Sequence, residues 1–263
     1  MSAKKSHQKL SSASWQFDEV IWQIIAHPLG NIIFIEERNQ ANKQVRFSAI
    51  DLQAENFLWR NITFEESWWI SLTASGDDVL YFTVYTNPQN PENKSLMAYN
   101  FRDQRILWFR NNLSFLTLTA NAVHGFDSRL SRKIQVKKTD GDSSDTLPVG
   151  ESSIETQVMT PHRYTRGTSN FETVYSFLKV KFGFEPSDVI EYLEFKEYVI
   201  ISYYLTGNSL ANYLLVLDGE GDVCVEEILG ERLEGIAVDS FFMLSGFLIF
   251  VKNKTVLVSC KLL

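Results

Sequence analysis

Short apolar runs separated by polar turns dominate the first half of the chain. Four such runs follow one another at residues 20–27, 32–37, 45–52 and 57–61. Each run is rich in β-branched and aromatic residues and is bounded by turn formers such as Gly, Pro, Asn and Asp. Four similar runs follow at residues 68–74, 79–85, 95–101 and 105–111. The pattern predicts antiparallel strands in groups of four.

Both groups carry the same triplet of residues around the turn between the third and fourth runs. The triplet is Ala49, Asp51 and Trp59 in the first group, and Ala98, Asn100 and Trp108 in the second. Repeats of this length are typical of propellers and solenoids, and four antiparallel strands make one propeller blade. We expect the Ala to let neighbouring blades approach, the Asp or Asn to accept backbone N–H bonds in the turn, and the Trp to cover the adjacent blade.

Two further copies lie in the last third of the chain. The third spans residues 189–228, with Val216, Asp218 and Glu226 at the places of the triplet. The fourth, at residues 235–263, supplies only three strands. We expect the missing outer strand to come from the N-terminus, where Trp15 precedes the first inner run. A strand donated in this way would close a ring and remove two sheet edges that otherwise invite aggregation.

The middle of the chain departs from the repeat. Strand-like runs at 113–120, 122–128 and 133–138 are followed by a polar loop at 139–153, and residues 153–160 could form a fourth strand. Apolar residues then recur at helical intervals over residues 170–182, after Ser169 and Glu172 at capping-box spacing and before Gly183.

These elements together predict an all-β protein with a single domain at residues 1–263. We expect a five-bladed β-propeller, with six blades or an irregular propeller-like array as alternatives. An insertion at residues 139–183 should contain the polar loop and one amphipathic helix between blades.

The triplet resembles the tryptophan-docking repeat of quinoprotein-type β-propellers, Ala-x-Asp-x-x-Thr-Gly-Lys-x-x-Trp. The Thr-Gly-Lys centre is absent: the two copies have Ala54-Glu55-Asn56 and Asp103-Gln104-Arg105 instead. The chain is also similar to a small family of uncharacterised bacterial propeller-like proteins, a domain of unknown function. This resemblance covers roughly half of the residues and implies an architecture. It implies no activity, because nothing in the chain matches the calcium and quinone site of quinone-dependent dehydrogenases.

Composition narrows the classes of partner. The 263 residues carry a formal net charge of −7, which argues against a nucleic-acid partner because binding phosphates needs a basic face. We find no signal-peptide pattern and no apolar run long enough to span a membrane. Cys224 and Cys260 are expected to be free thiols in a reducing compartment, with a disulfide between them as the alternative. A cytoplasmic monomer is the expectation.

Metal and cofactor motifs have little support. His7, His27, His124 and His162 are scattered, and no phosphate-binding or nucleophile-elbow motif is present. We therefore expect no cofactor. A weak calcium candidate is the loop with Asp140, Asp142, Ser144 and Glu151 at positions 1, 3, 5 and 12. Against it, Asp145 stands where the sharp turn needs Gly, so a mobile acidic loop is favoured.

Two groups of residues are candidates for binding a ligand or partner. His162, Arg163, Tyr164 and Arg166 lie together on a stretch outside the repeat, where they could grip an anion, a glycan or a partner's carboxylates. A solvated connector is the alternative. Trp68 and Trp69 open an inner strand, so one of them could stack on a sugar at a channel mouth; a core role is the alternative.

Two functions of different class remain. The first is a non-catalytic binding or scaffold module whose protein partner is unknown. The second is a propeller that binds or hydrolyses a small glycan in its central cleft. Hydrolysis needs two carboxylates about 5–10 Å apart. The available residues are Glu36, Glu37, Glu65, Glu66, Glu226 and Glu227, and the sequence does not show whether any two converge.

Overall fold

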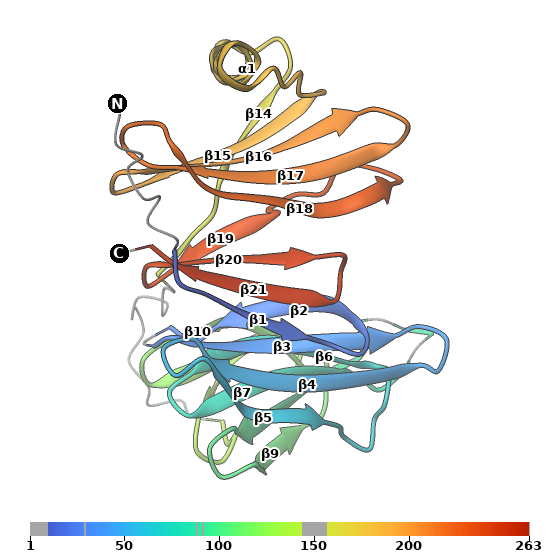
Figure 1. Cartoon of the computed structure of the whole chain (residues 1–263). Helices are drawn as coiled ribbons and strands as arrows, with labels where there is room; N and C mark the ends of the chain where they lie inside the picture. The colour runs from blue at the N-terminus through green and yellow to red at the C-terminus, as the bar shows by residue number, and fades with distance from the viewer. Residues whose placement is uncertain (1–9, 29, 88, 91, 144–156, 263) are drawn as a thin grey trace. The chain divides into compact units, whose positions relative to one another are not determined.

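Five antiparallel sheets make up most of the protein (Figure 1). The computed structural model describes residues 10–28, 30–87, 89–90, 92–143 and 157–262. The chain divides into two compact units. The central unit is Glu19–Gln157, and the terminal unit combines Met1–Asp18 with Val158–Leu263. The central unit is therefore inserted, along the sequence, within the terminal unit.

The central unit contains three sheets whose strands are neighbours in chain order (Figure 1). Sheet 1 consists of β2 (Val20–Ala26), β3 (Ile32–Asn39), β4 (Gln44–Asp51) and β5 (Asn56–Ile62). Sheet 2 consists of β6 (Ile70–Gly76), β7 (Val79–Tyr85), β8 (Lys94–Asn100) and β9 (Arg105–Arg110). Sheet 3 consists of β10 (Leu113–Leu118), β11 (Ala122–Asp127) and β12 (Arg132–Lys137). The two predicted groups of four strands are thus confirmed.

Sheet 2 is buried on both faces. Phe82 on β7 meets Phe47 of sheet 1 edge to face, with ring centroids 4.8 Å apart. Its neighbour Tyr81 points to the opposite face and stacks on Phe115 of sheet 3 at 6.3 Å. Because successive strand residues face opposite sides, a strand between two sheets has no polar side, and β7 accordingly is apolar at every position except Thr83.

The terminal unit contains two sheets of five strands. Sheet 4 consists of β14 (His162–Thr165), β15 (Val189–Phe195), β16 (Tyr198–Thr206), β17 (Leu210–Leu217) and β18 (Val223–Leu233). Sheet 5 has the order β1 (Ser12–Gln16), β21 (Val256–Lys261), β20 (Phe247–Lys252), β19 (Phe241–Leu244) and β13 (Val158–Met159). In sheet 5, Ser12 pairs with Cys260, and the buried Trp15 lies opposite Leu257. The predicted pairing of the N-terminal strand with the last strand is confirmed.

Helix α1 (Ser169–Phe182) covers one face of sheet 4. Its buried residues Phe171, Val174 and Leu178 pack with sheet residues such as Ile201. The helix begins one residue before the predicted start, and the N-cap is Thr168, not Ser169, because the Thr168 hydroxyl accepts the Phe171 N–H. Gly183 ends the helix at φ 77°, as predicted. Among the described residues, no helix is both long and apolar enough to cross a membrane.

Two predictions for residues 153–167 are corrected by the pairing of β13 and β14. Val158 and Met159 pair with β19 of sheet 5, whereas the sequence suggested a fourth strand beside the runs at 113–138. Residues 162–165 pair with β15 of sheet 4, whereas the sequence suggested an irregular stretch. One continuous segment thus adds an edge strand to both sheets of the terminal unit. The predicted insertion at 139–183 therefore includes ordered strands of these sheets.

The repeated tryptophans dock neighbouring sheets, as expected. Trp59 lies opposite Ala49 in sheet 1 and donates its indole N–H to the Phe101 carbonyl of sheet 2 at 2.9 Å. Trp108 lies opposite Ala98 and donates to the Lys138 carbonyl, just after β12, at 2.8 Å. Both alanines are fully buried, and both tryptophans are at most 8% exposed. The small residue makes room for the indole of its cross-strand partner.

The acidic or amide member of each triplet caps its turn, as expected. The Asp51 carboxylate accepts the Gln53 and Ala54 N–H groups at 2.9 Å each. The side-chain oxygens of Asn100 and Asp218 accept backbone N–H groups in the same way.

The third copy differs in its tryptophan place. Val225, not Glu226, lies opposite Val216, because the turn after Asp218 is one residue shorter.

Candidate functional site

Trp22 is the most exposed tryptophan described in the central unit. It is 65% exposed and belongs to β2, the first strand of sheet 1. The cause is local: the register of β2 against β3 shifts between Ile21 and Gln23, so Trp22 is the extra residue of a β-bulge. Bulges re-aim side chains and are frequent beside functional sites. The bulge therefore turns an indole outward, where it loses the burial that favours aromatic residues.

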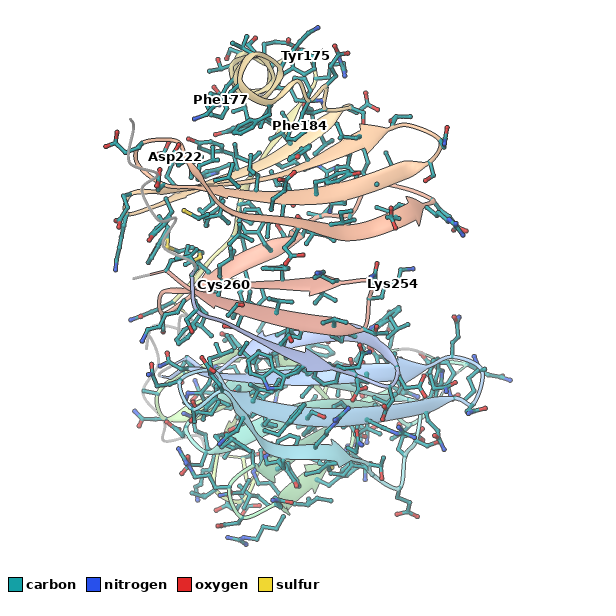
Figure 2. All side chains as sticks on the ribbon, in the orientation of Figure 1. Tyr175, Phe177, Phe184, Asp222, Lys254 and Cys260 are labelled. Atoms are coloured by element: carbon teal, nitrogen blue, oxygen red, sulfur yellow. The ribbon has the colours of Figure 1, made fainter. Side chains whose placement is uncertain are left out.

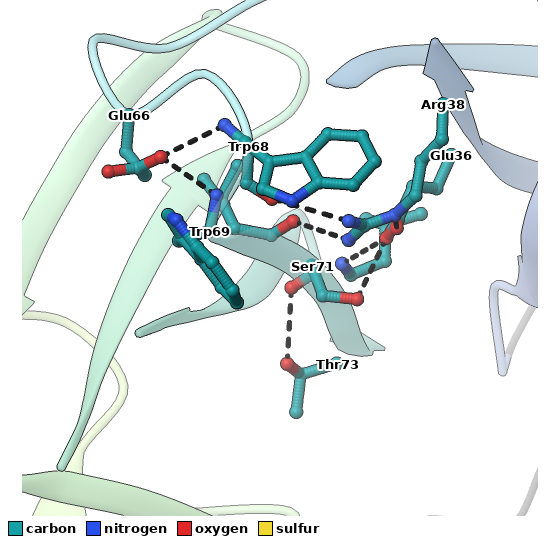
Figure 3. Close-up of polar contacts among 9 residues, drawn as sticks. Glu36, Arg38, Glu66, Trp68, Trp69, Ser71 and Thr73 are labelled. Atoms are coloured by element: carbon teal, nitrogen blue, oxygen red, sulfur yellow. Dashed lines mark hydrogen bonds and ion pairs between the residues drawn. The ribbon is translucent and has the colours of Figure 1, made fainter. Parts of the chain in front are cut away.

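The Arg38 guanidinium contacts this indole and a second one, that of Trp68. It lies 5.4 Å from the Trp22 ring centroid and 5.0 Å from that of Trp68. The same group donates to the carbonyls of Trp68 at 3.2 Å and Ile70 at 2.9 Å (Figure 3). A planar cation between two aromatic faces is a favourable cation–π arrangement. Lys43 adds a further cation, its ammonium 4.6 Å from the Trp68 ring.

The buried Glu36 carboxylate fixes the Arg38 guanidinium. The Glu36 side chain is fully buried, and its Oε1 accepts the Arg38 Nε–H at 2.6 Å. The other oxygen accepts the Ser71 hydroxyl at 3.0 Å and the Leu72 N–H at 2.7 Å, both on β6 (Figure 3). A buried carboxylate must be paired and hydrogen-bonded, and Glu36 satisfies both needs with groups from sheets 1 and 2.

Glu66 fixes the backbone of Trp68 and of its neighbour Trp69. One Glu66 oxygen accepts the backbone N–H groups of Trp68 at 2.9 Å and Trp69 at 2.7 Å (Figure 3). Both tryptophans precede β6, whereas the sequence placed them in the inner strand itself. Trp68 is half-buried, and Trp69 is 42% exposed. We call Trp22, Arg38, Lys43, Trp68 and Trp69 the tryptophan cluster.

The cluster presents aromatic faces and cationic edges at a preorganised surface. The carboxylates beside the cluster, Glu36 and Glu66, both accept backbone hydrogen bonds and so serve to position neighbouring groups. The arrangement can therefore stack on a flat apolar surface and donate hydrogen bonds at its margin.

The sequence predicted Trp68 and Trp69 but missed Trp22 and Arg38. The available signal was the run Glu36-Glu37-Arg38 at the end of an apolar strand, where consecutive charges are unusual.

Three of the candidates His162, Arg163, Tyr164 and Arg166 lie on the edge strand β14, and Arg166 directly follows it. Arg163 donates to the Ala237 carbonyl at 3.2 Å. Arg166 donates to the Pro186 carbonyl at 2.9 Å, lies 3.5 Å from the Asp188 carboxylate, and covers the Phe171 ring of α1. Tyr164 stacks on Tyr192, and His162 is exposed at the start of the strand. These two arginines thus tie β14 to its surroundings, and the four side chains are not gathered round one point.

The calcium candidate is only partly within the described residues. The Asp140 carboxylate accepts the Asp142 N–H at 2.9 Å, and this hydrogen bond holds the pKa of Asp140 below its ordinary value. The turn serves to dock Trp108, because Gly141, at φ 74°, lies flat against the indole and a side chain there would collide with it. Ser144 and Glu151 lie outside the described residues. Within the described part of the chain, no three His, Cys, Asp or Glu side chains gather as a metal site would require.

Of the remaining candidate carboxylates, two are held by separate contacts and two are exposed. Glu37 is buried and accepts the Glu19 N–H at 3.3 Å. In the terminal unit, Glu227 pairs with Lys252 at 2.5 Å, and Glu226 is exposed on β18. Glu65 is exposed in the central unit.

Comparison with known proteins gives a family match over part of the chain. The family described as Domain of unknown function (DUF4905) matches residues 26–108, which include β3 to β8 and end at Trp108. The match therefore covers the Arg38–Trp68 contact and the first docking tryptophan. No curated protein matches the chain.

Solved structures that resemble the chain do so weakly. One is an oligogalacturonate lyase in complex with manganese, at 9% identity and a TM-score of 0.32, covering 100% of this chain and 99% of that chain. Another is the β-propeller domain of the Trilobed protease from Pyrococcus furiosus, at 11% identity and a TM-score of 0.30, covering 89% of this chain and 78% of that chain. A third is a member of the duf4221 family from Bacteroides vulgatus, at 8% identity and a TM-score of 0.20, covering 97% and 98%.

Proposed function

We propose that the protein is a non-catalytic binding module and that the tryptophan cluster is its binding surface. The observation that carries the proposal is Trp22, a 65% exposed residue on a β-bulge whose indole lies against the Arg38 guanidinium, which also lies over the Trp68 ring. Trp and Arg are the residues most enriched at the energetic centres of protein interfaces. Because Arg38 is already fixed by Glu36, little side-chain entropy is lost when a partner binds.

The surroundings of the cluster support binding without catalysis. Hydrolysis of a glycosidic bond needs one carboxyl to donate a proton and another to act as a base or nucleophile. Glu36 is fully buried behind Arg38, and Glu66 caps two backbone N–H groups. Both carboxylates therefore have structural partners in place of a substrate.

Binding of a small glycan is a second candidate, and the exposed faces of Trp22 and Trp69 favour it. An indole face can stack on the apolar face of a sugar ring, and the edge of Arg38 offers donors for hydroxyl or carboxylate groups. The two candidates differ in their partner and share the same residues.

A pair of matched variants tests the proposal. Trp22→Ala removes the exposed indole, and Ile106→Ala removes a 51% exposed side chain from β9 as a control. Purified wild type and variants should be compared on a glycan array, and by quantitative recovery of proteins from lysate followed by titration of the purified partner. We expect Trp22→Ala to weaken binding by at least about 2 kcal/mol, as at an interface hot spot, with Ile106→Ala close to wild type.

The outcome also separates the candidates. Glycan binding that is lost only in Trp22→Ala supports the glycan candidate. Binding of a purified protein that is lost only in Trp22→Ala supports the protein-binding candidate. If Trp22→Ala retains every ligand and partner of the wild type, the tryptophan cluster is not the binding surface.

For the architecture, we propose that the five sheets are the blades of one propeller. The docking of Trp59 and Trp108 on the next sheet along the chain and the pairing of β1 with β21 support it. Two-dimensional class averages by electron microscopy, with the protein fused to a larger carrier, should then show a five-fold ring. Classes with two separate lobes would contradict the ring, while light scattering would test the expected monomer.

A further inference from the structure

A groove of about 450 Å³ lies in the terminal unit between α1 and sheet 4. One wall is the face of α1 with Val174, Phe177 and Lys181. The opposite wall is the sheet, with Ile201 and Leu217. The turns β15–β16 and β17–β18 form its end. Figure 2 shows Phe177 on α1 and Asp222, in the second of these turns, at the same end of the sheet. The volume is within the range of small-molecule sites.

The inner surface of the groove is apolar and contains an available ring. Val174, Ile201 and Leu217 are buried and belong to one hydrophobic cluster, so the floor of the groove is apolar and well packed. Phe177 is 38% exposed although it lines the groove, so one of its faces is open to a ligand. A ligand with an apolar body would gain by covering this surface.

The end of the groove is acidic. Glu197, Asp218 and Glu220 line it, against Lys181 as the lining cation. Asp218 uses one oxygen to cap its own turn, accepting the Glu220 N–H at 3.0 Å and the Asp222 N–H at 2.8 Å. The lining includes three acidic residues and one lysine, and this excess of negative charge would be complemented by a second cation.

Lys181 shows that an ammonium group fits this end. Its Nζ donates a hydrogen bond to the Gly221 carbonyl, in the turn between β17 and β18. It also lies 5.7 Å from the Phe177 ring and 5.6 Å from the Phe182 ring. A carbonyl, aromatic faces and nearby carboxylates are the groups that recognise organic ammonium ions. The protein thus places its own ammonium where that of a ligand would be favourable.

We infer that the groove binds a small organic ammonium compound with an apolar body. The apolar body lies against Val174, Ile201 and Phe177, and the ammonium lies toward Glu197 and Glu220. Lys181 competes for the same end and sets an upper limit on affinity. This site is in the terminal unit and is independent of the tryptophan cluster, so either proposal can fail alone.

The test uses three probes that share a ring and differ in charge: phenethylammonium, 2-phenylethanol and phenylacetate. Binding to the full-length protein is followed by NMR shift titration at low salt. We expect the ammonium to bind most tightly and phenylacetate most weakly. The double variant Glu197→Gln/Glu220→Gln should bind phenethylammonium about fivefold or more weakly and bind 2-phenylethanol with unchanged affinity. Phe177→Leu should weaken phenethylammonium binding about threefold, because the apolar body of the ligand loses its contact with the aromatic ring.

Lys181→Met gives the sharpest test, because its expected effect has the opposite sign. It removes the competing cation and keeps the apolar stem, so phenethylammonium should bind about threefold more tightly. The control Glu231→Gln removes one negative charge at the far end of β18 and should have no effect. Thermal melts by circular dichroism verify that every variant is folded.

Three results would overturn the inference. The first is equal affinity for phenylacetate and phenethylammonium. The second is unchanged or weaker ammonium binding in folded Lys181→Met. The third is binding of a lysine-rich peptide at these residues with no binding of any of the three probes, which would identify the groove as a contact for a macromolecule.

Discussion

Trp59 and Trp108 perform the same task at neighbouring junctions of the central unit. Each indole is buried, and each donates to a carbonyl just beyond the third strand of the next sheet. The residue type explains the spacing: an indole needs a small partner across the strand, and Ala49 and Ala98 supply it. Residue chemistry and periodicity together were sufficient to predict this contact.

Two replacements of Trp59 distinguish the contribution of its aromatic ring to stability from that of its hydrogen bond. Trp59→Phe leaves the Phe101 carbonyl without its donor and should destabilise the protein by about 2 kcal/mol. Trp59→Ala should cost about 3–5 kcal/mol, because it also leaves a cavity. The free energies of unfolding come from urea titrations followed by far-UV circular dichroism. Trp22→Phe, at an exposed position, is the matched control and should change stability by less than about 0.5 kcal/mol. Equal losses for Trp59→Phe and Trp22→Phe would contradict the docking role.

Cys260 makes stability fall at alkaline pH. Burial raises the pKa of this thiol from 9.0 to about 11. In the unfolded chain the thiol ionises near pH 9, whereas in the folded protein it stays neutral to about pH 11. The stabilising contribution is therefore complete below pH 9 and disappears as the pH rises through 11.

Comparison with Cys260→Ala isolates this effect from the other ionising groups. Between pH 8 and 10.5, wild type should lose about 2 kcal/mol more unfolding free energy than the variant, in parallel urea titrations at each pH. Parallel pH profiles for the two proteins would show that Cys260 is not the group responsible.

Residue reasoning cannot supply contacts with partners that are distant in sequence. Arg163 and Arg166 are cationic and three residues apart, which favours a binding role from sequence alone. Their actual partners are Ala237, Pro186 and Asp188. The exposure of Trp22 depends on one extra residue in β2, and no local pattern in "VIWQIIAH" marks a bulge.

The elements were predictable where strand length, periodicity and turns agreed. The repeated strands of sheets 1 and 2 are examples. The short strands β13 and β14 were not, because two to four residues carry no periodicity and their order comes from pairing with β19 and β15. Likewise, the face of sheet 4 that α1 covers became evident only from packing.

The start of α1 gives a direct test at the element scale. Thr168 accepts the Phe171 N–H, while the sequence suggested Ser169 as the cap. Thr168→Ala should therefore destabilise the terminal unit by about 1 kcal/mol, and Ser169→Ala by only a few tenths. Hydrogen exchange of the α1 amides measures both. A larger loss of protection for Ser169→Ala would move the cap to the residue that the sequence suggested.

At the scale of the whole molecule, the two units differ in how the chain supplies them. The central unit is one continuous segment, Glu19–Gln157, whereas the terminal unit needs both ends of the chain. A fragment of residues 19–157 should fold alone. A fragment of residues 158–263 lacks β1 and leaves β21 as an unpaired edge, so it should aggregate.

A permuted fragment should restore the terminal unit. Lys261 donates its N–H to the Ser11 carbonyl at 3.0 Å, so a short linker from residue 263 to residue 10 would form a hairpin from β21 into β1. We expect the permuted fragment, residues 158–263 followed by 10–18, to be monomeric by gel filtration and to melt cooperatively. The same fragment with Trp15→Ala is its control and should melt at a lower temperature. Soluble, cooperative folding of 158–263 without β1 would refute this requirement.

The pairing of β1 with β21 also determines when each unit can fold during synthesis. The ribosome releases β1 first among the described strands and β21 last. At typical translation rates of about 5–20 residues per second, β21 is synthesised on the order of tens of seconds after β1. The central unit can mature during that interval, but the terminal unit cannot finish until β21 has emerged from the ribosome. A premature stop codon shortly before β21 would therefore leave one unit intact and the other a substrate for chaperones and proteases.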